Sequence, residues 1–533
     1  MISRIFCVLA AFSFGLLISE ANADFLVYKL GTKGQRKQPR GRGAFGGPAG
    51  PTAAPQGPGM GGPGMYGNGS AAGAGAEVVL YGTIKKEGAG IMYSHPEVGE
   101  PLIFQTNQVE IKTAPTLKAE FHKKMNQAGK EPDAVMHAAI WGLKKGLTGE
   151  FLQGVEKVLT LDPQHAAALR IRDLKREIDA PLPDQNDALL AKKLKLAVGQ
   201  SGMQIETSNH FILLHDTDSK SDHGRHLSRA KERLRLLEQA YKKFVLLFEA
   251  QQFELERPQE RFMVVLFKRH ADFQDCSQQL GVTLNGREGF WSPVHNITFF
   301  YDGSQSEESE YLKAEHDKLS QTAEDAKKKG SSLERQRDSE TLRQIKINNV
   351  LLEIDCWRSD MANVSRETTY QLAASLGVLP RRVGVPHWTR QGLAMYFEAP
   401  SDEAWAGTGA VDDARLEDYR FQQKDRLRSR IDFIVVDAKN DVIYAGSAQS
   451  ASTAPAWSLT HYLFEKRPQE LVAYYKLLGD MPRDVVLNPD VLGPLFSRAF
   501  GADHQSIQQE WQGYMRTLKS DIEQLEEAGG HSD

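Results

Sequence analysis

The chain has 533 residues, of which 41% are hydrophobic and 25% are charged, and its formal net charge at pH 7 is -4. This composition is that of a globular protein, and the length allows more than one domain with at least one large core. A net charge this close to zero excludes an overall field that would attract nucleic acid, so we expect no nucleic-acid partner.

The N-terminus has the composition of a secretory signal peptide. Arg4 precedes an apolar run at residues 5–18, and the A-x-A motif that ends at Ala23 predicts cleavage before Asp24. Residues 1–23 are therefore assigned to a signal peptide, with a retained membrane anchor as the alternative. No later stretch reaches the ~18 consecutive apolar residues of a membrane-spanning helix, so we expect no transmembrane segment after cleavage. The protein is expected to be exported to the periplasm, the cell surface or the medium.

Residues 24–78 are predicted to be a disordered linker. Most of this segment consists of the basic run GTKGQRKQPRGRG followed by a long stretch rich in glycine, proline and alanine. Such a composition buries too little apolar surface to offset the entropy lost when a chain becomes ordered. The basic run could contact an anionic polymer or a lipid surface, but a solvated tether is the favoured interpretation.

Two small modules are predicted after the linker. Residues 79–115 contain the runs VVLYGTIKK, IMYS, PLIFQ and VEIKT, which predict a small β unit of about three or four strands. Residues 116–195 change to a helical period, and Asp162-Pro163 separates two of the helices. The alternation of large and small apolar residues resembles one tetratricopeptide-like helical hairpin. Because no second copy follows, we interpret it as a spacer rather than a peptide-binding array.

Residues 205–302 combine strand and helix patterns, which predicts an α+β lobe. The expected elements are a strand at 210–215, an amphipathic helix at 228–247, a buried strand at 261–267, and a hairpin formed by GFW at 289–291 and NITFFY at 296–301. The fold class expected for the whole protein is therefore α+β.

A charged insert is predicted at residues 303–350. The apolar positions of its heptad-like pattern are Leu312, Leu319, Ala323 and Ala326. This pattern predicts a helical hairpin with coiled-coil character, interrupted at Gly330. Two interpretations remain open: an arm for self-association, and a solvated intramolecular hairpin, which the short and alanine-rich seam favours.

The strongest chemical signal lies in a predicted helical lobe at residues 351–525, which precedes a flexible tail at 526–533. Residues 365–398 read SRETTYQLAASLGVLPRRVGVPHWTRQGLAMYFE. An H-E-x-x-H zinc peptidase carries two histidines one turn apart on a helix, and the Glu between them deprotonates the metal-bound water. A carboxylate from the next helix completes the ligand set in one class of these enzymes.

The residues at the corresponding positions here are unsuited to zinc. Arg366 and Tyr370 occupy the two histidine positions, Glu367 the general-base position, and Gln391 the position of the third ligand. An arginine stays cationic and has no lone pair to offer, and a tyrosine binds metal only as a phenolate from an ordinary pKa near ~10. A glutamine offers only a neutral oxygen. We therefore expect no metal, no cofactor and no catalysis by Glu367.

This region resembles the secreted domain-of-unknown-function 1570 family, which is gluzincin-like and related to HExxH metallopeptidases. The resemblance rests on PHWTRQGLAMYFE at residues 386–398 and on AWSLTHYLFEK at 456–466. It implies a zincin-like domain with a degenerate active site over roughly residues 205–520. It also implies that Trp388, Tyr396 and Glu398 line a cleft, and that the 456–466 helix packs behind it.

The remaining histidines are weaker candidates for metal ligands. His295 and His387 lack a histidine partner one helical turn away, so each is expected to lie at the surface or to be hydrogen-bonded. His223 and His226 are three residues apart but lack a third ligand.

The cysteines leave the redox state open. Of the three, Cys7 lies in the predicted signal peptide. Cys276 and Cys356 either form a disulfide after export or remain reduced thiols. No Cys-x-x-Cys pair indicates a metal knuckle or a redox site.

The leading hypothesis from these patterns is an exported, catalytically inactive peptidase-like protein that binds a polypeptide or a cell-envelope partner through the old cleft. NITFFY is the candidate edge strand for pairing with a bound peptide, and a buried interior strand is the alternative. Two other functions remain open. One is an active hydrolase that uses Glu367 with a non-standard metal site, and the other is a structural scaffold.

Overall fold

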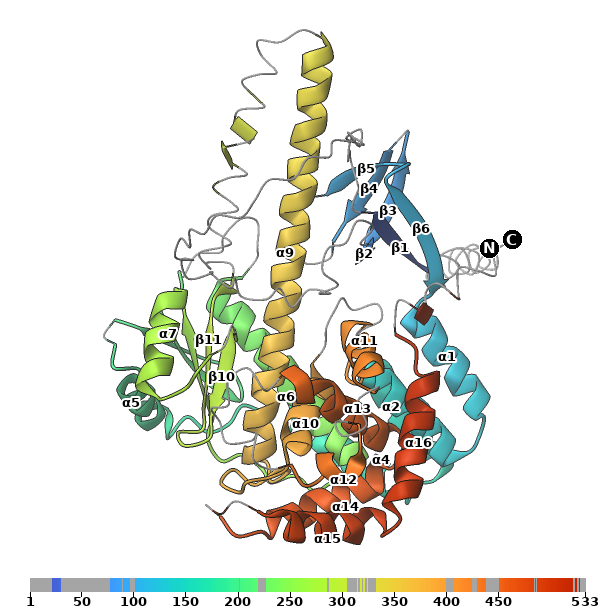
Figure 1. Ribbon diagram of the computed structural model, residues 1–533, viewed down its shortest axis with the longest axis vertical. Helices are drawn as coiled ribbons and strands as arrows, with labels where there is room; N and C mark the ends of the chain where they lie inside the picture. The colour runs from blue at the N-terminus through green and yellow to red at the C-terminus, as the bar shows by residue number, and fades with distance from the viewer. Residues whose placement is uncertain are drawn as a thin grey trace, which may run out of the picture.

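The computed structural model in Figure 1 has an α+β fold, as the sequence predicts. The structure describes residues 22–29, 77–88, 90–95, 101–200, 202–218, 227–284, 287–303, 332–398, 407–411, 413–423, 429–437, 450–483, 485 and 487–520, with the isolated positions 314, 317, 318, 320, 321, 324, 523, 524 and 527. The pair His223 and His226 and the heptad positions predicted for the charged insert lie outside these residues.

A five-stranded sheet forms the centre of the α+β lobe. Its strands are β7 (Gln204–Thr207), β8 (Phe211–His215), β9 (Phe262–Phe267), β10 (Gly289–Ser292) and β11 (Ile297–Tyr301). The order is β10-β11-β9-β8-β7, with β8, β9 and β11 parallel and the two outer strands antiparallel to their neighbours. All residues of β8, β9 and β11 are buried, as expected of strands covered on both faces.

The strand order corrects one prediction. The NITFFY segment forms β11, which is hydrogen-bonded to β10 on one side and β9 on the other. It is therefore an interior strand and has no free edge for a bound peptide. The edge beside it is β10, which the GFW segment supplies.

Helices cover both faces of this sheet. On one face α5 (Asp187–Val198) and α7 (His270–Gln279) pack through Leu190, Leu194 and Phe273. On the other face lie α6 (Arg229–Ala250) and α9 (Ser332–Ser375), a continuous helix of 44 residues. The residues of β8 and β9 alternate between these two hydrophobic clusters, because successive side chains on a strand point to opposite faces.

Ion pairs join α6 to α9 and to the end of the sheet. Arg229 contacts Asp302 at 2.8 Å and Asp360 at 3.2 Å, and Arg233 makes a short contact with the same Asp360. These side chains are largely buried, so the charges compensate one another inside the protein. The contacts fix the position of α9 relative to the sheet.

The other helices pack against α6 and form the lower part of the molecule in Figure 1. Those from the predicted tetratricopeptide-like region are α1 (Leu117–Ala128), α2 (Pro132–Lys144), α3 (Thr148–Leu161) and α4 (Ala166–Leu174). Those after α9 are α10 (His387–Phe397), α11 (Asp413–Gln422), α12 (Ile431–Ile434), α13 (Ser450–Lys466), α14 (Pro468–Gly479), α15 (Pro489–Phe500) and α16 (His504–Thr517). Both sets contribute to one hydrophobic cluster.

The N-terminal β unit has two three-stranded sheets. Its strands are β1 (Asn22–Lys29), β2 (Glu77–Tyr81), β3 (Thr83–Glu87), β4 (Gly90–Ser94), β5 (Leu102–Gln105) and β6 (Val109–Pro115). The orders are β2-β1-β6 and β3-β4-β5. On α9, Ile347, Val350 and Ile354 complete the hydrophobic cluster of this unit.

Strand β1 corrects the predicted start of the linker. Residues 24–29 had been placed in the linker, but they pair with β2 and β6 through a short apolar run, FLVY. The register joins Phe25 to Tyr81 and Lys29 to Glu77, so the predicted cleavage before Asp24 would keep the whole part of β1 that pairs with β2. The run was missed because glycine-rich and basic sequence follows it.

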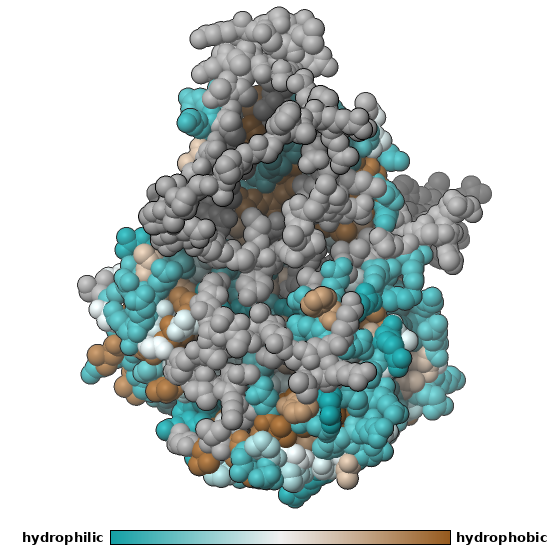
Figure 2. All heavy atoms as spheres, viewed as in Figure 1, coloured by the Kyte–Doolittle hydropathy of each residue, from teal (hydrophilic) through white to brown (hydrophobic). Residues whose placement is uncertain are grey.

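The described surface carries mainly polar side chains. In Figure 2 the described part of this face is mostly hydrophilic, with scattered hydrophobic residues of the kind that soluble surfaces usually expose. Within the described residues, no helix has both the length and the apolar character needed to cross a membrane. No disulfide joins Cys276 and Cys356, the two cysteines that the structure describes.

Helices α10 and α13 approach most closely at Gly392. A Cβ at this position would lie 2.6 Å from the Ala456 carbonyl oxygen and 2.8 Å from the Thr460 Cβ. The Thr460 hydroxyl also donates a hydrogen bond to the Trp388 carbonyl oxygen at 3.1 Å. The glycine of the Gly-Leu-Ala motif is therefore required by helix packing.

We expect Gly392→Ala to lower the free energy of unfolding by about 1–3 kcal/mol, because the added methyl group overpacks the α10–α13 contact. Gly513→Ala is the matched control, since Gly513 lies inside α16 and a Cβ there would meet no atom within 4 Å. The control should be neutral or stabilising by up to about 1 kcal/mol. Urea unfolding of both variants tests this, and equal effects would contradict the close packing at Gly392.

Candidate functional site

The end of α9 and the start of α10 bring the predicted site residues together. On α9, Tyr370 follows Glu367 by three residues and Arg366 by four, so its side chain is about one turn from each of them. Gly377, with a φ of 80°, allows the chain to leave α9 in a left-handed conformation. The chain then returns through α10, which carries Gln391 in its second turn.

Arg366 sits in an ion pair with two carboxylates. Its Nε lies 3.0 Å from Glu367 Oε1, and its Nη1 lies 3.7 Å from Glu398 Oε1. Nη2 donates to Asn363 Oδ1 at 2.5 Å, and Arg415 binds the other oxygen of Glu398 at 2.6 Å. The Glu367 and Glu398 side chains are only 3% and 7% exposed, so these charges compensate each other away from water.

The guanidinium stays charged in this environment. Burial alone would lower the pKa of Arg366, but the carboxylates of Glu398 and Glu367 outweigh it and hold the pKa above its ordinary value. The positive charge therefore lies between two acidic side chains. The partners of Arg366 are Glu367, Asn363 and Glu398.

Both carboxylate oxygens of Glu367 accept hydrogen bonds. One binds Arg366, and the other accepts a hydrogen bond from the Trp291 backbone N–H at 3.1 Å. Trp291 belongs to β10, so the carboxylate covers the edge of the sheet where an added strand would pair. A Cβ at Gly289 would likewise lie 3.2 Å from the Glu367 Cγ. This hydrogen bond occupies the Trp291 N–H that strand addition at this edge would use.

Tyr370 and Gln391 bind each other. The Tyr370 hydroxyl donates a short hydrogen bond to Gln391 Oε1. The Tyr370 ring also stacks on Trp291, with centroids 6.4 Å apart and planes 18° apart. Tyr370 on α9 and Gln391 on α10 are therefore joined directly, and Arg366 lies one turn before Tyr370 on α9.

Two residues predicted to line a cleft lie in the core instead. Trp388 is 1% exposed and stacks on Tyr474 at 5.4 Å, and Tyr396 is fully buried and stacks on Phe464 at 4.3 Å. Both project from α10 toward the helices behind it, because α10 is enclosed between α9 and α13. Glu398, the third predicted residue, does reach the site through Arg366 and Arg415.

The helix behind the site packs as expected. α13 contains the 456–466 segment and lies along α10, and Leu459, Tyr462 and Leu463 are all buried in the shared cluster. Glu465 at its end accepts hydrogen bonds from Lys144 and Tyr396, both at 2.7 Å. These bonds anchor α13 to α2 as well as to α10.

The environment of His387 differs from the prediction. It was expected to be exposed or hydrogen-bonded, but it is 4% exposed, and neither ring nitrogen has a hydrogen-bond partner among the described residues. Burial lowers the pKa of His387 to about 4. The Asp437 carboxylate raises this pKa, whereas the positive charges of Arg287 and Arg390 lower it further. The imidazole is therefore neutral at pH 7.

His295 lies at the β10–β11 turn, where its Nδ1 is 3.1 Å from the Ser292 hydroxyl.

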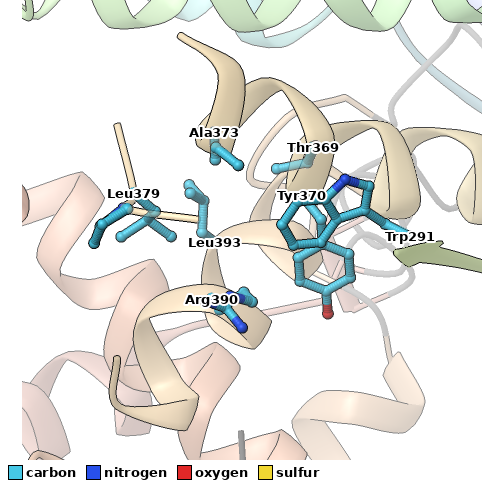
Figure 3. A pocket seen from close by; sticks show the side chains of 9 residues that line it. Trp291, Thr369, Tyr370, Ala373, Leu379, Arg390 and Leu393 are labelled. Atoms are coloured by element: carbon cyan, nitrogen blue, oxygen red, sulfur yellow. The ribbon is translucent and has the colours of Figure 1, made fainter. Parts of the chain in front are cut away.

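A small pocket beside the ion-paired centre has room for about one water molecule (Figure 3). It is lined by Trp291, Thr369, Tyr370, Ala373, Ala374, Leu379, Pro380, Arg390 and Leu393. The sequence analysis did not identify Trp291 or Arg390 as site residues. Arg390 stands directly before Gln391, but the position of Trp291 depends on the strand order of the sheet, which the sequence does not reveal.

These features define an α+β protein in which a salt-bridged centre joins the end of α9 to α10. Residues 360–482 match the model of a family described as "Protein of unknown function (DUF1570)", which confirms the family resemblance. The matched segment runs from the centre of α9 to just beyond α14 and so contains Arg366, Tyr370 and Gln391. Searches of curated proteins and of solved structures found no match.

We expect Arg366→Ala to lower the free energy of unfolding by about 3–5 kcal/mol, because it leaves the buried Glu367 carboxylate without its cation. Arg172→Ala is the matched control, since Arg172 is half exposed and pairs only with its neighbour Asp173. The control should change stability by less than about 1 kcal/mol. Urea unfolding at pH 7 measures both, and a small effect of Arg366→Ala would contradict the buried ion pair.

His387 should make folding sensitive to acid. The folded protein keeps the imidazole neutral down to a pKa of about 4, whereas the unfolded chain binds the proton near 6.5. The unfolded state therefore binds more protons between these values, and stability falls as the pH drops from 6.5 to 4. The contribution is about 3 kcal/mol. His387→Phe should remove this part of the acid sensitivity in unfolding curves recorded at pH 7, 5.5 and 4, and parallel curves for the two proteins would contradict the prediction.

Proposed function

We propose that this chain is an exported, catalytically inactive relative of the HExxH metallopeptidases that binds a polypeptide or cell-envelope partner. The observation that carries the proposal is the Arg366 guanidinium between Glu367 and Glu398. A cation built into the chain neutralises the carboxylates that a metalloenzyme would use around zinc.

The residues present do not fit a zinc ion. Arg366 would repel it, and Tyr370 uses its hydroxyl to donate to Gln391. Glu367 is the residue that would deprotonate a water, and both of its oxygens are already bonded. Zinc sites in proteins use Cys, His and carboxylate ligands, and the three positions here carry none of these. The chemistry of the donor set therefore supports a binding role over hydrolysis.

The preserved packing supports the relation to an enzyme. Gly392 allows the close α10–α13 contact, and α9 and α10 bring Tyr370 and Gln391 into direct contact. An arrangement that served only as a scaffold would have no need to keep these positions together. Export follows from the signal-like N-terminus, which places the proposed partner in the cell envelope or outside the cell.

Restoring the ligands tests the proposal. The triple variant Arg366→His, Tyr370→His and Gln391→Glu should bind one zinc ion per chain, because both histidines then lie one turn apart and face the new carboxylate. The parent protein should contain no stoichiometric zinc and should not cleave peptides. Metal analysis of both purified proteins gives the answer, and circular dichroism establishes that the variant is folded.

Two controls make this test specific. The double variant Arg366→His and Gln391→Glu lacks one histidine and should bind zinc at least about tenfold more weakly than the triple variant. Adding Glu367→Gln to the triple variant should leave zinc binding intact, because Glu367 is not a ligand. Zinc and peptidase activity in the parent, with the activity lost in Glu367→Gln, would establish an active enzyme and overturn the proposal.

A further inference from the structure

Strand β1 is the central strand of the first sheet in the N-terminal β unit. It lies between β2 and β6 and is antiparallel to both. Its register on the β2 side runs from Phe25 opposite Tyr81 to Lys29 opposite Glu77. In the part of the chain that the structure describes, β2 and β6 have no other partner in this sheet, so removing β1 would leave two separate strands.

The side chains of β1 form part of the core of this unit. The residues at 25–28 are each at most 4% exposed. The Tyr28 ring lies 5.3 Å from the Phe104 ring, and the Tyr28 hydroxyl accepts a hydrogen bond from Gln344 of α9 at 2.9 Å. Leu26 belongs to the hydrophobic cluster that α9 completes. Each β unit therefore needs one β1 strand, from its own chain or from another.

The connection between β1 and β2 is much longer than their pairing requires. Residues 30–76 join the two strands, although the register places Lys29 directly opposite Glu77, where a turn of about two residues would suffice. Connections within compact domains are usually about 4–6 residues long. A chain of the length of residues 30–76 can extend to about 150 Å. This reach allows β1 to enter the β unit of a neighbouring copy.

We propose that β1 is exchanged between two copies of this chain, so that residues 24–29 of each copy lie between β2 and β6 of the other. The strand makes the same hydrogen bonds and the same core contacts in both arrangements. The partner is a second copy, because that chain carries the sequence that already fits this position. The proposal goes beyond the proposed function and does not involve the ion-paired centre.

The length of the connection decides how strongly a chain prefers its own strand. Because the contacts are equal, this preference is set by the effective concentration of β1 beside its own sheet. That concentration is in the millimolar range for short flexible linkers and falls as linker length grows. The glycine-rich sequence of residues 30–76 predicts a connection of this kind. The exchanged form therefore becomes populated as the concentration of copies approaches this range.

Cysteine trapping tests the exchange on the full-length protein. One variant carries Val27→Cys in β1 and the other Val79→Cys in β2, and in both the native cysteines at positions 7, 276 and 356 are replaced by alanine. Val27 and Val79 are opposite each other in the register, and such Cα atoms are about 4.5–5.5 Å apart, which a disulfide can span. Neither variant can form this bond within one chain. With oxidised glutathione as the oxidant, a disulfide-linked dimer in the mixture therefore reports exchange.

Random collisions set the background of this experiment. A mixture of Val27→Cys with Arg172→Cys measures them, because the Arg172 side chain is half exposed. At about 0.1 mM of each chain, the Val27→Cys and Val79→Cys mixture should give at least about tenfold more linked dimer than this control. Nonreducing gel electrophoresis measures the yield, and mass spectrometry identifies the linked peptides. A single chain that carries both Val27→Cys and Val79→Cys should form the bond within itself.

A short connection provides the matched control. Replacing residues 30–76 with Asn-Gly joins Lys29 to Glu77 through a hairpin turn of about two residues, which holds β1 beside its own β2. In this background the yield of linked dimer should fall at least about tenfold, to the level of random collisions. The bond within the doubly substituted chain should still form. Circular dichroism establishes that the shortened protein is folded, and if it is not, the comparison with Arg172→Cys still decides.

Three results would overturn the proposal. A yield in the full-length protein no higher than that of the Arg172→Cys control would show that β1 stays with its own chain. An undiminished yield with the short connection would show that linked dimers form without exchange. Absence of the bond within the doubly substituted chain would contradict the β1–β2 register. None of these measurements depends on zinc or peptidase activity, so a failure here is distinguishable from a failure of the proposed function.

Discussion

The buried ion pair of Arg366 with Glu367 and Glu398 is the constraint on which the rest of the site depends. Two carboxylates in a largely water-free position require a cation nearby, because an uncompensated buried charge is costly. Arg366 satisfies them from within the chain. Glu367 can then cap the edge strand at Trp291, and Glu398 can tie α10 to Arg415. The site is thus a structural joint between the sheet and the paired helices, and the small pocket lies next to it.

The sequence predicted the parts of this joint that depend on helical spacing. Tyr370 lies one turn from both Arg366 and Glu367 on α9 because it follows them by four and three residues, and the Gly-Leu-Ala motif correctly placed Gln391 on the helix that meets them. The helix at 456–466 behind the site was implied by the family resemblance. Local periodicity is enough for these features, because each depends on residues close in the chain or on a motif of fixed length.

The predictions that were wrong concern contacts between segments far apart in the sequence. Trp388 and Tyr396 lie in the motif, but the direction in which they project is decided by where α13 packs. The edge strand was misassigned because the hairpin pattern does not reveal which of β10 and β11 pairs with β9. His387 gave no sign of burial, since its surroundings come from Arg287, Asp437 and the helix it begins. Strand β1 was hidden because a short apolar run was followed by sequence of linker composition.

The length of α9 has a mechanical consequence. At 1.5 Å per residue its 44 residues extend about 66 Å, and the helix contacts the N-terminal sheets through Ile347, Val350 and Ile354 before it reaches Arg366. Gln344 and Arg358 add hydrogen bonds to Tyr28 and to the Val79 carbonyl oxygen. The N-terminal sheets and the ion-paired centre are therefore attached to one continuous helix, about 18 Å apart along its axis between Ile354 and Arg366.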